Sequence, residues 1–474
     1  MALGKRTPKP LEGVIALQDL PVPPAHPFYQ RLNAVLEGAA FDSFVENLCR
    51  PYYAATVGRP GIPPGVYFRM LFVGYFEGLD AQRAIAWRCA DSRALQAFLG
   101  YLPTEATPDH SSLTKIRQRL PDSVHEQVFV FVLKLAADKG LLPGKSVGVD
   151  STLLEANAAM KTIVRRDSGD DWKDYVRKLA VEAGIDNPTD ADVRRFDRQR
   201  KGKKVSNEEW TSPSDPDSKI AKMKDGTTHL AYKAEHVVDL QTDLILAAPV
   251  YPADQPDSAT LLESVAAAQV HLLQAASGLS LEELAAQPEA AVAEVTALEG
   301  VAADTGYHKA ETLADCAAAE VRTYIPEKRR KQHRVWTDKP PDWERAYRNN
   351  RRRVVGSRSQ RLQKLRSEKV ERTFAHVCET GGGHRSWLRG LLKVGMRYLM
   401  RVAGHNLGII MRCVFGTGTP RSLQGLRAAV VVWIRGWVET LARTLRSWSA
   451  PRVWEGQGRL ADCTYLLLCM GLKI

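Results

Sequence analysis

The stretch Ser146-Val147-Gly148-Val149-Asp150-Ser151-Thr152-Leu153-Leu154-Glu155-Ala156-Asn157 decides how the rest of the chain is organised. Its first half alternates and is rich in β-branched residues, which predicts a buried strand. Asp150 places a carboxylate among apolar neighbours, where an unpaired charge is costly. A divalent cation shared with carboxylates from distant parts of the chain would supply the countercharge. The candidate partners are Asp304, at a second predicted strand end, and Glu371, on a predicted helix.

The whole chain is long and basic. Its 474 residues suffice for two or three domains with at least one sizeable core. A hydrophobic share of 44% and a charged share of 25% are ordinary for a globular protein. The formal net charge of +12 indicates a polyanionic partner.

The positive charge is concentrated between Lys328 and Arg372. This window holds 17 Lys and Arg against 5 Asp and Glu, so its excess of 12 equals that of the entire chain. Such a run predicts a surface that follows a phosphate backbone. Trp336, Trp343 and Tyr347 are interleaved with these charges. They either stack an unpaired base or anchor a basic loop to the core, and we favour anchoring.

The cysteines and the apolar runs bear on compartment. The 7 cysteines are dispersed and contain no Cys-x-x-Cys pair, which argues against a disulfide framework and a structural zinc site. The first ten residues lack the apolar segment of a signal peptide, and the longest apolar run, Ala428 to Ile434, is too short to span a bilayer. These features predict a soluble cytoplasmic protein without a membrane partner.

The first part of the chain, to about residue 130, is predicted to be helical. Helices are expected from Pro64 to Leu79, after an N-cap at Asp80, and after an N-cap at Asp109 with a basic face that reaches Leu120. Short helices followed by a basic one are typical of a DNA-contacting helix-turn-helix. They are equally typical of a small helical bundle.

Strands and helices alternate after residue 140. The strand with Asp150 is followed by a charged, partly helical insertion over residues 161–226 and by a hairpin over residues 229–250. A helix capped by Asp257 or Ser258, a strand ending at Asp304, another helix and strand, a basic segment and a long helix complete the order. This order predicts an α/β fold with one central mixed sheet flanked by helices.

Helical geometry selects the glutamate. Glu371 lies beside Phe374 and Cys378 at the border of the apolar stripe of its helix, whereas Glu368 lies among arginines and lysines. We therefore expect Glu371 to be the ligand and Glu368 to be an exposed ion-pair partner. The rival acids are Glu155, Asp239 and Asp254, which spacing alone does not dismiss.

Three acidic motifs carry a resemblance to a known family. They are Gly148-Val149-Asp150-Ser151-Thr152, then Ala303-Asp304-Thr305-Gly306-Tyr307, and then Val370-Glu371-Arg372-Thr373-Phe374 followed by Arg389-Gly390-Leu391. Together they resemble the motifs of DDE transposases, the enzymes of bacterial insertion sequences, and most closely the four/five superfamily. Residues 55–120, with Gly58-Arg59-Pro60 and Asp109-His110-Ser111, are similar to the N-terminal helical domain of that superfamily.

The resemblance, which covers most of residues 25–415, implies a fold and a domain plan. It implies a ribonuclease-H-like sheet flanked by helices, with an N-terminal all-α domain and a helical C-terminal tail. The expected domains are a DNA-binding domain over residues 1–130, a catalytic domain over residues 141–412 and a tail of unknown role over residues 413–474. In the tail, Ala428 to Trp448 is expected to form a helix that either packs or dimerises.

The resemblance also implies a site and a reaction. Asp150, Asp304 and Glu371 would bind two Mg²⁺ or Mn²⁺ ions, and the enzyme would cut DNA with water and transfer a 3′-hydroxyl into target DNA. Its partners would be the terminal repeats of the element, the target DNA and a second copy in a homodimer. The residues expected to bind DNA are Lys115, Arg117, Arg119, Lys328, Arg329, Arg330, Lys331, Trp336, Arg351, Arg352, Arg353, Arg366, Arg372 and Arg385.

This sequence departs from the family in three places. The Arg and Lys that many relatives carry around the Glu are replaced by Ser367 and Cys378, although Arg366 and Arg372 are close. The charged insertion separates strands that a tight turn would otherwise join. Residues from about 416 to 474 match no familiar pattern. Two other functions therefore stay open: a non-catalytic DNA-binding regulator or decayed transposase, and a metal-dependent nuclease without strand transfer.

Overall fold

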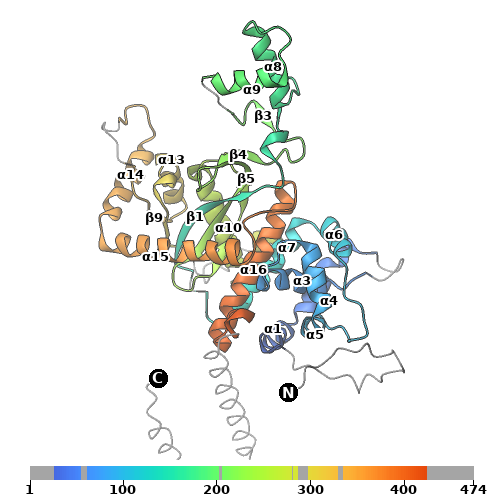
Figure 1. Cartoon of the computed structure of the whole chain (residues 1–474). Coiled ribbons are helices and arrows are strands. Elements are labelled where there is room, and N and C mark those ends of the chain that lie inside the picture. The colour runs from blue at the N-terminus through green and yellow to red at the C-terminus, as the bar shows by residue number, and fades with distance from the viewer. Residues whose placement is uncertain are drawn as a thin grey trace, which may run out of the picture. The chain divides into compact units, whose positions relative to one another are not determined.

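The computed structural model describes residues 26–54, 61–142, 144–201, 205–279, 281–286, 297–328 and 335–423 (Figure 1). The expected helix from Ala428 to Trp448, most of the expected tail, and Gly58-Arg59-Pro60 lie outside these residues. Residues up to Pro420 belong to one compact unit. In the described part of the chain, no helix is both long enough and apolar enough to cross a membrane.

The N-terminal region is helical, as expected. Its helices are α1 (Pro27–Gly38), α2 (Phe41–Cys49), α3 (Pro64–Phe76), α4 (Gln82–Asp91), α5 (Arg93–Phe98), α6 (His110–Arg119) and α7 (Asp122–Asp138). Nearly every residue of α3 is buried, which explains why this segment is apolar on all sides. Asp109 caps α6 by accepting a hydrogen bond from the Ser111 N–H. The cap expected at Asp80 is wrong, because Ala81 precedes α4 and the Asp80 carboxylate instead accepts a hydrogen bond from the Trp387 indole.

A mixed sheet forms the centre of the rest of the unit. Its order is β4 (Lys219–Lys222), β5 (Thr228–Asp239), β1 (Ser146–Glu155), β8 (Gly300–Ala302) and β9 (Arg322–Tyr324), and β6 (Ile245–Ala247) and β7 (Val250–Pro252) also pair with β5. Strand β1 is antiparallel to β5 and parallel to β8, and β8 is parallel to β9. The carboxyl ends of β1, β8 and β9 therefore point the same way. Residues far apart in the chain meet at those ends.

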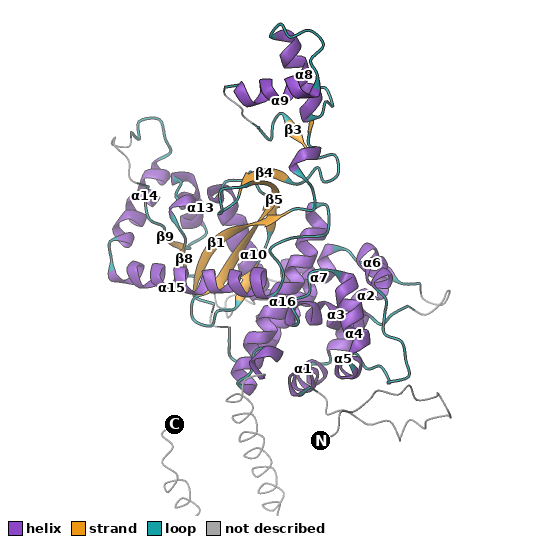
Figure 2. Ribbon diagram, in the orientation of Figure 1, coloured by secondary structure: helices purple, strands orange, loops and turns teal. Residues whose placement is uncertain are grey.

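Helices cover both faces of the sheet. Side chains alternate between the faces of a strand, so Gly148 and Asp150 face α15 (Ser357–Phe374), and Ser151 faces α10 (Asp257–Ser277). The remaining helices of this part are α11 (Leu281–Ala286), α13 (Ala310–Ala318), α14 (Pro341–Val354) and α16 (Leu391–Phe415). Figure 2 shows this arrangement. The predicted fold class, a mixed sheet flanked by helices with a helical N-terminal region, is confirmed.

The charged insertion folds around its own aromatic residues. It contains β2 (Val164–Arg165), α8 (Trp172–Glu182), α9 (Asp190–Gln199) and β3 (Trp210–Thr211). Trp210 is 1% exposed, and its ring lies 5.3 Å from that of Trp172 and 5.4 Å from that of Tyr175. The insertion is partly helical, as predicted. Its few aromatic residues provide the apolar core that its charged composition concealed.

Candidate active site

Asp150 lies on β1 directly beneath α15. The helix can approach this closely because residue 148 is glycine: a Cβ there would lie 2.8 Å from Leu240, 3.0 Å from Val370 and 3.2 Å from Arg366. Arg366 Nη1 then donates a hydrogen bond of 2.7 Å to Asp150 Oδ2. The countercharge that the sequence demands is thus supplied, in the protein alone, by an arginine.

The Asp150 carboxylate is nevertheless poorly compensated. Burial raises the pKa of Asp150 above its usual value, and the nearby Asp304 carboxylate raises it as well. The Ser151 N–H, Arg366 and Lys224 act in the opposite direction and lower this pKa. A carboxylate in this state gains free energy from an additional cation.

Asp304 lies just after β8, beside the carboxylate of Asp257, which the sequence predicts only as a possible helix cap. Asp304 Oδ1 accepts a hydrogen bond of 2.7 Å from the Gly306 N–H. A Cβ at Gly306 would lie 2.9 Å from both Asp304 Oδ1 and Asp257 Oδ2, so these two carboxylates flank the same glycine. Asp257 Oδ1 in turn accepts a hydrogen bond of 3.0 Å from the Ser151 hydroxyl. Asp257 is therefore linked to the residues next to both Asp150 and Asp304.

A buried polar cluster supports Asp257 on this face of the sheet. Lys233 is 3% exposed, and its Nζ lies 3.2 Å from Asp257 Oδ1. Glu235 is fully buried and accepts hydrogen bonds from Thr260 and Tyr307. Burial raises the pKa of Glu235, and its Oε1 lacks a hydrogen-bond partner among the described residues. The sequence pattern of β5 did not reveal this cluster. Charged residues at alternate positions of a strand usually indicate an exposed face, whereas here they point inward.

Glu371 lies on the exposed side of α15. Its Oε1 accepts a hydrogen bond of 3.3 Å from the Ser367 hydroxyl, one turn earlier. Glu368 pairs with Arg372 at 2.6 Å, which confirms its expected role as an exposed ion-pair partner. In the described residues, no three His, Cys, Asp or Glu side chains are grouped to hold a metal ion. Asp150 and Asp304 supply hard oxygen ligands suited to Mg²⁺ or Mn²⁺, whereas Glu371 does not complete the set in this conformation.

The rival acids lie in other environments. Asp239 is buried and accepts hydrogen bonds from the N–H groups of Gly144, Gln241 and Thr242, so it fixes a turn. Glu155 lies 3.6 Å from Arg385. Asp254 is exposed.

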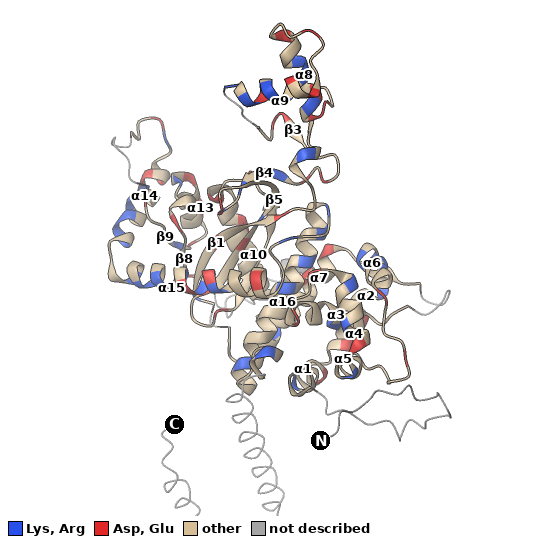
Figure 3. Ribbon diagram, viewed as in Figure 1, with Lys and Arg blue, Asp and Glu red and all other residues tan. Residues whose placement is uncertain are grey.

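The basic residues expected to bind DNA fall into groups with different environments. On α6, Lys115 and Arg119 are exposed, whereas Arg117 is half-buried and lines a cavity. On α14, Arg351 and Arg352 are exposed, whereas Arg353 donates hydrogen bonds to the carbonyl and hydroxyl of Thr323. Arg366 contacts Asp150. Figure 3 shows lysines and arginines along α14 and α15.

The remaining expected DNA contacts flank these helices. Lys328 is exposed, and Arg329, Arg330 and Lys331 lie outside the described residues. The Trp336 ring lies 5.1 Å from the Tyr347 ring, an arrangement that agrees with anchoring. Arg372 contacts Asp243 as well as Glu368, and Arg385 stacks over Trp387 at 4.7 Å.

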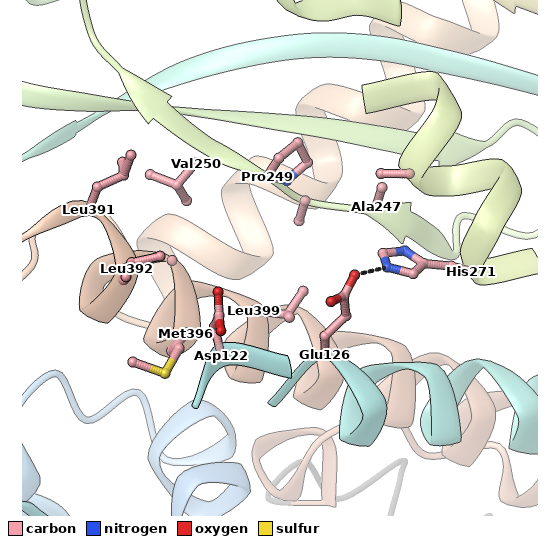
Figure 4. Close-up of a pocket in the computed structure, with 13 residues that line it drawn as sticks. Asp122, Glu126, Ala247, Pro249, Val250, His271, Leu391, Leu392, Met396 and Leu399 are labelled. Carbon is pink, nitrogen blue, oxygen red and sulfur yellow. Dashed lines mark hydrogen bonds and ion pairs between the residues drawn. The ribbon is translucent and has the colours of Figure 1, made fainter. Parts of the chain in front are cut away.

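A separate small cavity of about 250 Å³ lies between α7, α10, α16 and the loop that joins β6 to β7 (Figure 4). Its walls are mostly apolar, and Glu126 Oε1 lies within hydrogen-bonding distance, 3.0 Å, of His271 Nε2. None of Asp150, Asp304 and Glu371 lines it. This cavity belongs to the packing between helices, not to the carboxylate site.

Comparison with known families identifies two segments of the chain. A family described as "Transposase domain (DUF772)" matches residues 18–119, which include α1 to α6. A family described as "Transposase DDE domain" matches residues 295–411, which include Asp304 and Glu371. Neither a curated protein nor a solved structure matches the chain.

Proposed function

We propose that this chain, a DDE-type insertion-sequence transposase by its two matching family segments, cuts DNA at the ends of its element and joins the freed 3′-hydroxyl to target DNA. The observation that carries the proposal is the proximity of Asp150, in the middle of β1, to Asp304, just after the carboxyl end of the parallel strand β8, which is close enough for Asp304 to raise the pKa of Asp150. Two strands of a sheet give such carboxylates a rigid platform.

Asp150 and Asp304 would hold the metal, with Glu371 as the third ligand once its side chain turns from Ser367 toward the strands. Mg²⁺ or Mn²⁺ bound there would activate the attacking oxygen and stabilise the leaving oxygen of the phosphodiester. Within the chain itself, the hydrogen bond from Arg366 fixes the position of the Asp150 carboxylate. On the opposite face of β1, Ser151 and Lys233 both donate hydrogen bonds to Asp257 and hold its carboxylate in position.

The exposed cations would bind and orient the DNA. Lys115 and Arg119 on α6 and Arg351 and Arg352 on α14 are exposed. Contacts of such cations with phosphates position DNA without reading its sequence. The proposal includes the expected domains: a DNA-binding domain over residues 1–130, a catalytic domain over residues 141–412 and a tail over residues 413–474. The expected homodimer is also part of the proposal, since strand transfer brings two element ends together.

The test uses the purified full chain and the DNA that flanks its own gene. With Mg²⁺, the wild type should produce nicked or cut ends and, with a donor carrying a free 3′-hydroxyl, joined products. Asp150→Asn, Asp304→Asn and Glu371→Gln should each lower the cleavage rate by at least about 1000-fold, because each removes a ligand charge, and should leave DNA binding intact. Asp254→Asn, in an exposed rival acid, is the matched control. Cleavage that survives Asp150→Asn would overturn the proposal.

The exposed position of Glu371 favours one alternative, a non-catalytic DNA-binding regulator or decayed transposase. This alternative predicts that DNA binding persists in EDTA while no cleavage occurs with any divalent cation. A nuclease without strand transfer would share the site, and it would cut the flanking DNA without forming joined products.

A further inference from the structure

A second site lies at the junction of the two family segments. A cavity of about 500 Å³ is bounded by the turn between α3 and α4, by α6 and by the first turns of α16. Arg83 and Arg117 line it from the segment that matches the N-terminal transposase domain. Arg397 and Trp387 line it from the segment that matches the DDE domain. Neither the carboxylate site nor the exposed basic helices account for this cavity.

The protein compensates the arginines of this junction only in part. Arg117 Nε and Nη1 are buried and have no hydrogen-bond partner among the described residues. Arg401, one turn after Arg397, is 5% exposed; its Nη2 donates to the Leu79 carbonyl at 2.9 Å, and its Nη1 is likewise unpartnered. Buried donors without partners cost free energy, and a buried guanidinium costs more than a neutral group.

The charge balance points in the same direction. Burial lowers the pKa of Arg397 to about 10 and that of Arg401 to about 9, and the repulsion between the two contributes to the shift of Arg401. The acid that acts on both is Asp80, which also accepts the indole N–H of Trp387 at 2.8 Å. Arg397 and Arg401 therefore share one carboxylate, and Arg117 adds a further positive charge near Arg397. An anion in this cavity would supply countercharge to these half-buried and buried guanidinium groups and stabilise them.

The chemistry of the missing anion follows from the donors. The paired N–H donors of a guanidinium group match the oxygens of an anion. Donors that approach from two different helices suit the tetrahedral oxygens of a phosphate better than the planar oxygens of a carboxylate. Arg83 is exposed and half-buried His110 also lines the cavity, so its rim carries a further cation. We propose that this cavity binds a phosphate group of a DNA strand, which would hold the strand across the junction of the two domains. This inference rests on the proposed function, since it takes DNA as the source of the phosphate.

The first experiment measures thermal unfolding of the full chain in potassium phosphate and in potassium chloride of equal ionic strength. Phosphate should raise the Tm of the wild type by several degrees, because a ligand that binds only the folded state stabilises it. Arg397→Met should abolish this shift while keeping the Tm in chloride unchanged or higher, since it removes a half-buried cation that shares Asp80 with Arg401. Arg195→Met removes one charge from an arginine of the insertion whose side chain is 71% exposed, and it should retain the shift.

The second experiment measures binding of a random-sequence duplex in EDTA at several salt concentrations. Arg397→Met should weaken binding by up to about tenfold and reduce the slope of log K against log salt by about 1, as loss of one phosphate contact does. Arg195→Met should leave both values unchanged. Because cleavage is blocked in EDTA, the result is independent of whether Asp150 and Asp304 are catalytic.

The outcomes separate the sources of phosphate. A phosphate-dependent Tm shift that Arg397→Met abolishes, together with a smaller salt slope, supports the proposal. The same Tm result with an unchanged duplex affinity and slope would assign the cavity to a free phosphate anion and overturn the DNA assignment. A wild type that phosphate stabilises no more than chloride does would overturn the site itself.

Discussion

Burial sets the protonation state of single residues, and His125 is an example. His125 is 1% exposed, lies 3.1 Å from the Tyr67 hydroxyl and 3.1 Å from the Pro121 carbonyl, and burial lowers its pKa to about 4. A carbonyl can only accept, so Nδ1 carries the proton and Nε2 accepts from Tyr67. The neutral imidazole is therefore part of the folded core.

This burial gives the protein a pH dependence of known sign. The unfolded chain protonates His125 near pH 6.5 and the folded chain only near pH 4, so the stabilisation is complete above pH 6.5 and declines as the pH falls toward 4. Protonation of His125 in the unfolded chain should lower the free energy of unfolding by about 2 kcal/mol when the pH falls from 7.5 to 5. Urea unfolding of His125→Gln at both pH values should show a smaller difference than the wild type.

Exposed His384 provides the control for this measurement. His384→Gln should reproduce the difference between pH 7.5 and pH 5 found for the wild type. An equal difference in His125→Gln would mean that this imidazole is not held neutral by the fold.

At the scale of elements, glycines decide how closely helices approach their neighbours. In α16, a Cβ at Gly404 would lie 2.8 Å from the ring of Tyr75 on α3, whereas a Cβ at Gly395 would meet nothing within 4 Å. The same logic applies to Gly148, which lets α15 reach β1 and places Arg366 on Asp150. These contacts, and not helix propensity, explain glycine at positions where it weakens an isolated helix or strand.

Two alanine substitutions in one helix should therefore have opposite effects. Gly395→Ala should stabilise the protein by about 0.5 to 1 kcal/mol, because alanine is the better helix former. Gly404→Ala should destabilise it by about 1 to 3 kcal/mol, because the added methyl group overpacks the contact between α16 and α3. Chemical unfolding of both variants gives the comparison. Equal stabilisation by both would show that Tyr75 moves freely out of the way.

At the scale of the whole molecule, some arginines form ion pairs within the protein and others are exposed to solvent. Arg345 and Arg348 on α14 pair with Asp342 and Glu344, at 2.8 and 2.5 Å. Arg351 and Arg352, farther along the same helix, are exposed. An exposed surface cation acts over about one Debye length and attracts a polyanion before any contact forms.

The salt dependence of DNA binding should report this distribution. The double variant Arg351→Gln and Arg352→Gln should lower duplex affinity and reduce the slope of log K against log salt by about 2, because two phosphate contacts are lost. Arg345→Gln and Arg348→Gln together remove the same charge from paired residues and should change the slope less. Fluorescence anisotropy at 50 to about 200 mM salt would measure both. Equal slopes in the two double variants would contradict a special role for the end of α14.

The sequence by itself determined the elements and the family. Alternation marked β1 and β5, N-cap chemistry marked α6, and three short acidic motifs indicated a transposase whose two family segments are confirmed. These features are local, so they can be read from neighbouring residues. The site residues Asp150, Asp304 and Glu371 remain a prediction on that basis.

Only the tertiary structure decided what those residues meet. It paired Asp150 with Arg366, placed Asp257 beside Asp304, and turned Glu371 outward. It also enclosed Arg117 and Arg397 in a cavity, although the pattern of α6 treats Arg117 like exposed Arg119. The physical reason is that burial and pairing depend on contacts between residues hundreds of positions apart, and local periodicity contains no information about such contacts.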